Sequence, residues 1–365
     1  MKKTADSIPC KVLVNSKDPK YAEEIREFQG CPSIAITRKG RIYTAWYSGG
    51  WVEPHMKNYN LVNFSDDGGK TWTQNIVVIP SDIDRWVQAL DIQLWIAPDG
   101  RLFIFWVQNN TIPIGMGVKG YTIDGFVFND SRHAQWFVTC DNPDDDEPRF
   151  SQPTCIGMGF MRCKPTVLQS GRWLLFNYDQ SNDRYGYSIT DDEGKTFTRR
   201  YGARKIPTPF DESMAYQRDD GTIHMLARSS VGRLAETFST DNGETWSKAR
   251  ASQFLDPSSR LYVSKTSSGK VVLVNNDHAE RRTNMTVFLS DDDGVTFKYK
   301  KCIDTNEHLS YPDLDFYNGK MYLVYDRERC HAREIRMAVF TEEDIMDPNV
   351  KIKPQIISKS TYTKG

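Results

Sequence analysis

Side chains suited to catalysis and ligand binding recur where strand-like segments of this chain begin or end. The starts carry residues 29–31, Asp91, Arg162, Lys164, Asp211, Glu212, Arg260, Tyr311 and Asp313. The ends carry residues 47–55, Gln108, Asp179, Arg228, residues 277–282 and residues 326–329. Buried strands usually end in turn residues, whereas these end in carboxylates, guanidinium groups, a phenol and indoles. Arginines beside aromatic rings suit an anionic or polyhydroxylated ligand, so the pattern indicates a binding surface.

The segments that position these residues form a repeat. Six stretches consist of a strand-like run, a polar turn that contains glycine, and a second strand-like run. They are residues 32–46, 91–106, 164–177, 212–228, 260–275 and 311–325. The flanks are rich in β-branched and aromatic residues, as in Lys-Val-Val-Leu-Val-Asn at 270–275. Asp-Gly and Asn-Gly turns between such runs are a strong hairpin signal, so the sequence predicts six hairpins.

A second motif follows four of the six hairpins. Residues 65–72 read Ser-Asp-Asp-Gly-Gly-Lys-Thr-Trp, and the pattern Ser/Thr-x-Asp-x-Gly-x-Thr-aromatic returns from Thr190, Ser239 and Ser290. The last three copies start 49 and 51 residues apart, a spacing that indicates a repeat architecture. In each copy the Asp can accept hydrogen bonds from turn N–H groups, and Gly takes a positive φ. The motif is similar to the Asp box of sialidases and related propellers, and its predicted role is structural.

Together the two repeats predict an all-β fold, a six-bladed β-propeller. Each hairpin supplies the first two strands of a blade, and each Asp box turns a third strand into a fourth. The length of 365 residues fits one propeller domain over residues 1–365, with an insertion at about 109–162 in the second blade. A terminal strand is expected to complete the last blade, and residues 10–15 and 350–358 are both candidates for it.

Blade geometry restricts where a site can form. If the first strand of a blade starts at the upper face, its glycine turn lies at the lower face and the second strand ends at the top. The Asp box between the third and fourth strands then also lies at the lower face. Residues that open first strands and close second strands should therefore converge on the upper face around the axis, where we expect the pocket.

Composition limits the expected partners. The chain has 47 Lys and Arg residues and 48 Asp and Glu residues, a net charge of −1, which implies no attraction to nucleic acid or to an anionic membrane. No apolar run approaches the roughly 20 residues of a membrane span, and no apolar signal-peptide core follows the basic N-terminus. Seven cysteines without paired spacing favour free thiols in a reducing compartment. We expect a cytoplasmic protein, with export after removal of a signal peptide as the alternative.

The sequence does not indicate a metal or cofactor site. His224, His278, Cys330 and His331 lack the spacing of metal ligands. The acidic stretch at residues 141–147 lacks the Asp-x-Asp-x-Asp-Gly register of a calcium loop. The expected cofactor is therefore none, and the expected partner is a glycan or small saccharide.

Over almost its whole length the chain resembles the sialidase superfamily, most closely in blades four to six. Glu212 opens the fourth hairpin and Arg228 closes it, at places where the family carries a Glu and an Arg. Arg282 fits the position of a further family arginine better than Arg281 does. Tyr311, in the context Ser-Tyr-Pro-Asp-Leu, matches the tyrosine that opens the sixth blade in the family.

This resemblance implies a retaining glycosidase with a tyrosine nucleophile, an exception to the usual pair of carboxylates. Tyr311 would attack the sugar, and Glu212 would take its proton, because a phenol with a pKa of about 10 is a poor nucleophile at neutral pH. Arg228 and Arg282 would bind the carboxylate of the substrate through bidentate bonds. From their positions at strand ends, the further expected substrate contacts are Trp51, Asp91 and Asp313.

The chain departs from the family pattern at two places in the first blade. Sialidases open this blade with Arg-Ile-Pro, whose Arg belongs to the carboxylate clamp, whereas residues 30–32 here are Gly-Cys-Pro. Arg26, a short distance upstream, is the candidate substitute. The loop that carries the general-acid Asp of the family holds Glu53 and His55 here. Glu53 is the first choice for the general acid and His55 the second.

Simpler roles remain open for these residues. Tyr311 could serve to pack a strand, and Glu212 could form a structural ion pair with Arg228. Arg282, Glu53 and His55 could be solvated surface side chains.

Three functions compete: a sialidase-like exo-glycosidase for a terminal acidic sugar, a related glycosidase for a deoxy sugar or uronic acid, and a propeller that binds glycans without cleaving them. The Tyr311–Glu212 pair argues against the third function, and the altered first blade keeps the second close to the first.

Overall fold

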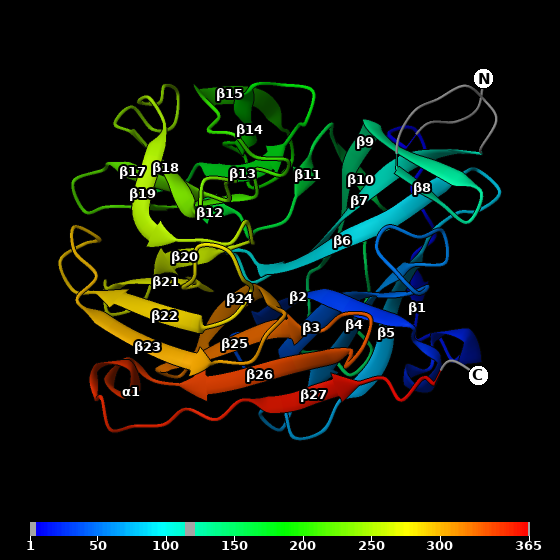
Figure 1. Cartoon of the computed structure of the whole chain (residues 1–365). Helices are drawn as coiled ribbons and strands as arrows, with labels where there is room; N and C mark the ends of the chain where they lie inside the picture. Colours follow the sequence, from blue (N-terminus) through cyan, green and yellow to red (C-terminus); the bar gives the residue numbers. More distant parts are fainter. Residues whose placement is uncertain (1–4, 114–120, 364–365) are drawn as a thin grey trace. The chain divides into compact units, whose positions relative to one another are not determined.

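The computed structural model describes residues 5–113 and 121–363, and in them the chain folds into six sheets (Figure 1). Helix is sparse: α1 spans Glu342–Met346, and short 3-10 turns span Pro19–Tyr21 and Glu23–Ile25. Each sheet contains four or five strands and forms one blade. The fold class is therefore the predicted one, an all-β six-bladed β-propeller.

The chain divides into two compact units. The first unit holds the described residues up to Phe160, Asp326–Arg336 and the described residues from Ile356 onward. The second unit holds Met161–Tyr325 and Met337–Gln355. A single domain over residues 1–365 remains a prediction.

Two sheets lie almost entirely in the first unit (Figure 1). The strand order of the first sheet is β1 (Leu13–Val14), β5 (Thr73–Pro80), β4 (Tyr59–Ser65), β3 (Ile42–Gly49) and β2 (Phe28–Ile36). The order of the second is β10 (Thr154–Gly157), β9 (Phe126–Cys140), β7 (Leu102–Pro113) and β6 (Val87–Ile96), with β8 (Tyr121–Ile123) paired to β9.

The next three sheets belong to the second unit, apart from one strand residue at its border. The third contains β11 (Phe160–Met161), β13 (Trp173–Tyr178), β14 (Arg184–Thr190) and β15 (Thr198–Arg204), with β12 (Thr166–Val167) paired to β13. The fourth contains β16 (Ser213–Gln217), β17 (Ile223–Ala227), β18 (Arg233–Ser239) and β19 (Arg250–Leu255). The fifth contains β20 (Tyr262–Lys265), β21 (Val271–Asn276), β22 (Met285–Ser290) and β23 (Tyr299–Asp304).

The sixth sheet contains β24 (Leu309–Tyr317), β25 (Lys320–Arg327), β26 (Glu334–Phe340) and β27 (Gln355–Lys359). Its fourth strand thus comes from the C-terminal candidate, while the N-terminal candidate supplies β1 at the edge of the first sheet, where Leu13 pairs with Val78. The insertion in the second blade extends the β7–β9 hairpin, in which Pro113 pairs with Phe126. Residues 114–120 of the insertion lie outside the described residues.

The four Asp boxes form the turns between third and fourth strands, as predicted. In the box that starts at Ser290, Asp292 Oδ1 accepts hydrogen bonds from the Ser290 hydroxyl at 2.7 Å and from the Thr296 N–H at 2.8 Å. Gly294 adopts a φ of 76° and donates its N–H to Ser290 Oγ at 2.8 Å. The same Asp–Thr bond recurs in the other boxes, at Asp67, Asp192 and Asp241.

Within the second unit the Asp boxes and the glycine turns lie on the same side. Ser170, in the turn of the third blade, donates to Asn242 in the box of the fourth at 2.8 Å. The N–H of Asp219, in the turn of the fourth blade, donates to Asp293 in the box of the fifth at 2.6 Å. The candidate site residues of this unit lie at the opposite ends of the strands, away from the Asp boxes and glycine turns.

Each unit has its own apolar core. Strand β21 is buried on both faces, and Val271–Val274 are 0% exposed within a cluster that also holds Leu226 and Leu323. In the first unit Ile104 and Trp106 of β7 pack with Val77 and Leu94. Strands covered on both faces need continuous apolar runs, which is why these hairpin flanks do not alternate with polar residues.

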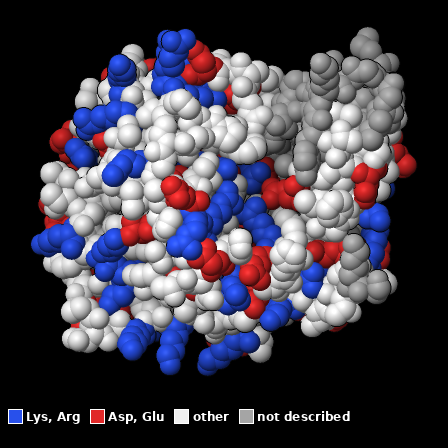
Figure 2. Space-filling view, in the orientation of Figure 1, with Lys and Arg blue, Asp and Glu red and all other residues white. Residues whose placement is uncertain are grey.

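Charges of both signs intermingle on the face of the molecule drawn in Figure 2, in keeping with the net charge of −1. Among the described residues, no helix has the length and apolar character needed to cross a membrane.

We predict that Asp292→Asn lowers the midpoint of thermal unfolding by roughly 2–6 °C at neutral pH, because an amide cannot replace both acceptor oxygens. Hydrogen bonds from Thr296 and Ser290 lower the pKa of Asp292 from 3.8 to about 2. A lowered pKa stabilises the fold above pH 3.8 and ceases to do so as the pH falls through about 2. The gap between wild type and variant, followed by circular dichroism, should shrink over that range.

Val295→Ala is the matched control, since this side chain of the same turn is 65% exposed. A gap that stays constant down to pH 2 would show that the turn does not depend on the ionised carboxylate.

Candidate active site

Tyr311 and Glu212 come together in the second unit although they belong to different blades. Tyr311 lies on β24 and is 4% exposed, and Glu212 directly precedes β16 and is 1% exposed. The Tyr311 hydroxyl donates to Glu212 Oε1 at 2.6 Å. This distance lies within the range expected for a nucleophile and the base that activates it.

The fourth hairpin brings Arg228 to the same carboxylate. Strands β16 and β17 pair with Ser213 opposite Ala227, and the Arg228 N–H donates to the Glu212 carbonyl at 2.9 Å. The Arg228 guanidinium then donates to Glu212 Oε2 at 2.9 Å and contacts the Tyr311 hydroxyl at 3.2 Å. Hairpin register therefore fixes the pair that the sequence placed at the two ends of one repeat.

The electrostatics of this pair keep the carboxylate charged. Burial alone would raise the pKa of Glu212, but the positive charges of Arg228 and Arg162 and the bond from Tyr311 outweigh it and lower the pKa to about 2. Burial acts against the charge of Arg228 as well, yet Glu212 raises the pKa of Arg228 above its ordinary value. At neutral pH the site thus holds an ionised acceptor beside a phenol that donates to it.

Arg282 also lies at this site. Its guanidinium is 5.8 Å from the centre of the Tyr311 ring and donates to Ser310 Oγ at 3.1 Å and to the Ser258 carbonyl at 2.9 Å. Arg281 instead forms an exposed ion pair with Glu307 at 2.8 Å. Of the two neighbouring arginines, Arg282 is therefore the one near Tyr311, as its alignment suggested.

Two further arginines lie at the tyrosine, and sequence reasoning assigns no role to either of them. Arg162 follows β11, with its guanidinium 5.4 Å from the Tyr311 ring centre and its Nε 3.7 Å from Glu212 Oε1. Arg260 precedes β20 and is 2% exposed, with its guanidinium 5.0 Å from the same ring centre. The sequence predicts both at the start of a first strand, which is the place that Tyr311 occupies in its own blade. This shared position is the signal that could identify them.

Arg260 donates hydrogen bonds to the backbone. It donates to the carbonyls of Tyr311 and Pro312, both at 3.0 Å, and to the carbonyl of Arg162 at 2.7 Å. Tyr311 has a φ of 56°, a left-handed conformation that costs a bulky residue about 1–3 kcal/mol. Arg260 is thus positioned to hold the backbone that presents the phenol.

Asp313, another expected substrate contact, is buried two residues beyond Tyr311. It lies 4.0 Å from the Lys164 ammonium, which also pairs with Asp315 at 3.3 Å and donates to the Leu314 carbonyl at 2.7 Å. Asp313 thus lies beside a lysine that contacts the same strand.

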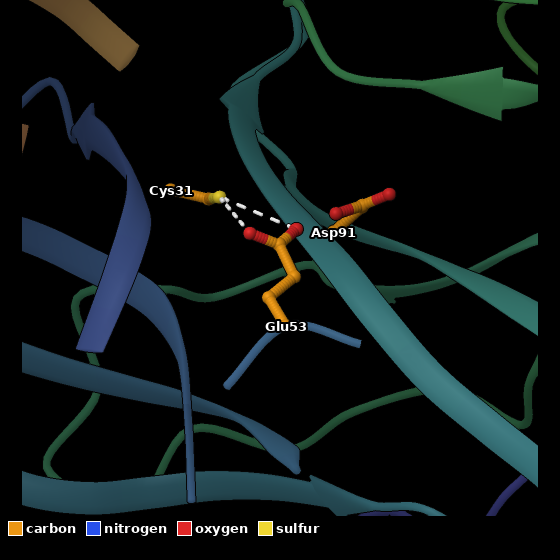
Figure 3. A group of neighbouring side chains, drawn as sticks. All are labelled: Cys31, Glu53 and Asp91. Carbon is orange, nitrogen blue, oxygen red and sulfur yellow. Dashed lines mark hydrogen bonds between the residues drawn. The ribbon is translucent and has the colours of Figure 1, made fainter. Parts of the chain in front are cut away.

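The remaining candidates belong to the first unit, where Glu53 lies against Cys31 and Asp91 (Figure 3). The Cys31 thiol contacts the two Glu53 oxygens at 3.8 and 3.7 Å, and possible ligand atoms of the three residues lie within 4.8 Å of one another. These are the described side chains that come nearest to a metal-binding group. Arg329 binds Glu53 Oε2 at 3.0 Å, and its positive charge opposes a cation at that carboxylate.

The space beside Gly30, where sialidases carry the clamp arginine, is filled by Arg329. A Cβ at position 30 would lie 2.6 Å from Arg329 Cδ and 2.7 Å from its Cγ. The guanidinium is held by Glu53 and, at 3.0 Å, by Asp326, which also accepts the Cys31 N–H at 2.7 Å. An arginine therefore does lie at this place, but it comes from the segment after β25 and is bound by two carboxylates.

Arg26 is buried in a different environment. Its guanidinium donates to Gln29 Oε1 at 3.1 Å, to the Tyr21 carbonyl at 2.9 Å and to Asn75 Oδ1 at 3.4 Å. These bonds tie the N-terminal segment to the first blade. They favour a structural role for Arg26 over the role of clamp substitute that the sequence suggested.

His55 and Trp51 contact the insertion of the second blade. His55 Nε2 lies 2.6 Å from Asp124 Oδ2, and the Trp51 indole donates to the same oxygen at 3.4 Å. The hydrogen bond from His55, with help from Trp51, lowers the pKa of Asp124 against the effect of burial. Trp51 remains 51% exposed and keeps a ring surface open, whereas His55 is 1% exposed.

Cys31, Asp91 and Tyr311 share a backbone feature. Their φ angles are 57°, 57° and 56°, and each lies within the first strand of its blade, β2, β6 or β24. In β2 and β6 the pairing register shifts at this point, between Gly30 and Ser33 and between Leu90 and Gln93. Bulges of this kind re-aim side chains and are common beside active sites.

Residues 121–323 match the family described as BNR repeat-like domain, which is more than half of the chain. The chain belongs to this family. An anhydrosialidase from Macrobdella decora is 24% identical over 234 residues, which cover 57% of this chain and 31% of that protein. The chain thus spans about a third of the length of that curated relative.

Solved sialidases have a similar fold. The Hadza microbial sialidase superposes with a TM-score of 0.68 at 18% identity, covering 87% of this chain and 66% of its own. The intramolecular trans-sialidase from Ruminococcus gnavus gives a TM-score of 0.68 at 15% identity, covering 92% of this chain and 98% of its own. At these identities the likeness shows the fold, and the sialidase resemblance of the sequence is consistent with it.

We predict that Arg260→Met lowers the free energy of unfolding by about 2–4 kcal/mol, because three buried carbonyls lose a charged donor. Urea denaturation followed by tryptophan fluorescence measures the change. Arg281→Met is the matched control, since its exposed pair with Glu307 should contribute only about 0–1 kcal/mol. Equal losses in the two variants would contradict the anchoring role of Arg260.

Proposed function

We propose that this protein is a retaining exo-glycosidase of the sialidase type that releases a terminal acidic sugar from a glycan. The observation that carries the proposal is the 2.6 Å hydrogen bond from Tyr311 to the buried carboxylate of Glu212. A phenol that donates to an ionised carboxylate is arranged to lose its proton as it attacks. Similarity to an anhydrosialidase and to solved sialidases supports the same reaction class.

In the proposed first step, Tyr311 Oη attacks the anomeric carbon and its proton passes to Glu212. A bond forms between the sugar and the tyrosine, the bond to the leaving glycan breaks, and a general acid protonates the leaving oxygen. Water then attacks the same carbon and gives a proton to that acid group, while Tyr311 leaves and recovers its proton from Glu212. Two displacements at one carbon retain its configuration.

A phenol suits a substrate that carries its own charge. A sugar with a carboxylate at the anomeric carbon would repel a carboxylate nucleophile, whereas a neutral phenol avoids this repulsion. Arg228 and Arg282, both close to Tyr311, are the proposed partners of the substrate carboxylate. The two arginines would thus bind the substrate carboxylate, the same group that would repel a carboxylate nucleophile.

For the general acid, the sequence resemblance favours Glu53, with His55 second. Both side chains have partners in the first unit, since His55 Nε2 lies 2.6 Å from Asp124 Oδ2 and Arg329 donates to Glu53 Oε2 at 3.0 Å. Trp51 and Asp91 are proposed to contact the substrate. These assignments rest on strand positions and on the resemblance.

The second candidate is a glycosidase of the same superfamily that acts on a deoxy sugar or uronic acid. The observation that favours it is the place beside Gly30, where Arg329 is bound by Glu53 and Asp326. A guanidinium with two carboxylate partners has less capacity to bind a substrate carboxylate than one without them. A propeller that binds glycans without cleaving them is the third candidate.

We predict that Tyr311→Phe lowers kcat by about three orders of magnitude or more, because no other group replaces the nucleophile. Its unfolding midpoint should stay within a few degrees of wild type, since the ring keeps its packing. Turnover of aryl glycosides at saturating substrate measures the first quantity. Tyr317→Phe, on the same strand outside the site, is the control. Near-wild-type turnover by Tyr311→Phe would refute the nucleophile assignment.

A panel of aryl glycosides should separate the candidate substrates. We expect kcat/KM on ordinary sialosides to stay below about 10⁴ M⁻¹s⁻¹, a modest value for an enzyme, because one clamp arginine is replaced. Higher efficiency on a sialoside would show that the clamp is complete, and activity on a deoxy sugar or uronic acid alone would select the second candidate. Products should be resolved into free and anhydro sugar, since similar proteins include an anhydrosialidase and an intramolecular trans-sialidase.

A further inference from the structure

The carboxylate of Glu212 lies between two guanidinium groups that contact different oxygens. Arg228 donates to Oε2 at 2.9 Å, and Arg162 Nε lies 3.7 Å from Oε1. Oε1 is also the oxygen that accepts the hydrogen bond from Tyr311. Arg162 therefore acts on the atom that would receive the proton in the proposed reaction.

Arg162 is held in place from another blade. Its carbonyl accepts a hydrogen bond from Arg260 at 2.7 Å, and Arg260 also binds the carbonyl of Tyr311. Its side chain is 9% exposed, much like the 8% of Arg228. Arg260 thus holds the backbone of both Tyr311 and Arg162, and these two hydrogen bonds set the distance between them.

A buried carboxylate tends to take up a proton, because burial removes the water that stabilises its charge. A protonated Glu212 could not accept the proton of Tyr311, so the proposed chemistry needs cations at this carboxylate. Arg228 contacts the phenol and Ser258 Oγ as well as Glu212. A second cation beside Oε1 would hold the proton-accepting oxygen ionised.

We propose that Arg162 is the positioning residue that keeps Glu212 ionised at the oxygen that receives the Tyr311 proton. The inference rests on the proposed function, because it assigns Arg162 a part in that same step. Arg162 acts through Glu212 and forms no bond with the sugar.

Other titratable groups face Glu212, and their effects on the pH dependence of the rate have to be distinguished from the effect of Glu212. The charged and titratable neighbours are Arg162, Cys163, Asp211, Arg228, Asp256 and Tyr311. Burial, opposed by Lys205, raises the pKa of Asp211 to about 6. Burial, opposed by Ser259, Arg228 and Arg282, raises the pKa of Asp256 to about 7. Either carboxyl could produce an acid limb in a rate profile, so each needs its own variant.

The positive charges around Glu212 determine the direction in which its pKa should change when Arg162 is lost. Burial raises its pKa, while Arg228 and then Arg162 lower it to about 2. Loss of Arg162 should therefore raise the pKa of Glu212, so that the carboxylate becomes protonated at a higher pH. An opposite charge at this distance typically shifts a pKa by about 1–3 units.

The experiment compares Arg162→Met and Arg162→Lys with wild type. The acid limb of kcat/KM should move up by about 1–2 pH units in Arg162→Met and return most of the way in Arg162→Lys, which keeps the charge. Asp211→Asn and Asp256→Asn identify limbs that belong to those groups. Arg281→Met, an exposed arginine of the same unit, should leave the profile unchanged.

A second readout does not need turnover. Infrared difference titration follows the carboxyl band of Glu212, identified as the band absent from Glu212→Gln, and this band should appear at higher pH in Arg162→Met. A uniform loss of rate at every pH, or an unmoved Glu212 band, would overturn the proposal. If wild type cleaves no glycoside of the panel, the proposed function fails, while the titration still decides the role of Arg162.

Discussion

Burial of an ionised Glu212 is the constraint on which the candidate site depends. A charge removed from water is costly unless partners surround it, and here those partners are Arg228, Arg162 and Tyr311. They come from the fourth, third and sixth blades, so no single blade could stabilise this carboxylate. The repeat makes the arrangement possible, because every blade brings a strand end to a corresponding place.

A second constraint acts on the backbone. Tyr311 adopts a left-handed φ of 56°, which an isolated tyrosine would avoid. Arg260 donates hydrogen bonds to the backbone carbonyls of Tyr311 and Pro312. Cys31 and Asp91 repeat this conformation in the first unit. Strain of this kind persists only where surrounding contacts hold it. The conformation recurs in three first strands, where it re-aims the side chains that these strands carry.

The fold could be predicted because its signals are local. Each Asp box encloses its own Ser, Asp, Gly and Thr within a few residues, and each hairpin turn lies between its two strands, so sequence spacing alone identifies them. The same signals located Glu212, Arg228 and Tyr311, since strand register places them at strand ends. The sequence does not decide which terminal strand completes the last blade, because residues 10–15 and 350–358 are both suitable and only the pairing of β1 and β27 distinguishes them.

The contacts that could not be predicted are made by long side chains across blades. The guanidiniums of Arg162 and Arg260 reach Glu212 and the backbone of Tyr311, and the direction of such a flexible chain is set by tertiary packing rather than by spacing. Arg26 shows the converse, because its short distance from Gly30 along the sequence makes it a candidate, whereas its bonds to Gln29 and Tyr21 favour a structural role.

Arg329 occupies the space beside Gly30, the position at which this chain departs from the sialidase pattern. A side chain at position 30 would collide with the stem of Arg329, so Arg329 would have to move to make room for it. An arginine on β2 would reach the place along its own strand, whereas Arg329 arrives from the segment after β25 with Asp326 and Glu53 bound to its guanidinium. A guanidinium supplied by Arg329 is therefore surrounded by different charges from one supplied by β2. The consequence of Gly30 for an anionic sugar therefore depends on the two carboxylates bound to Arg329 as much as on the missing side chain.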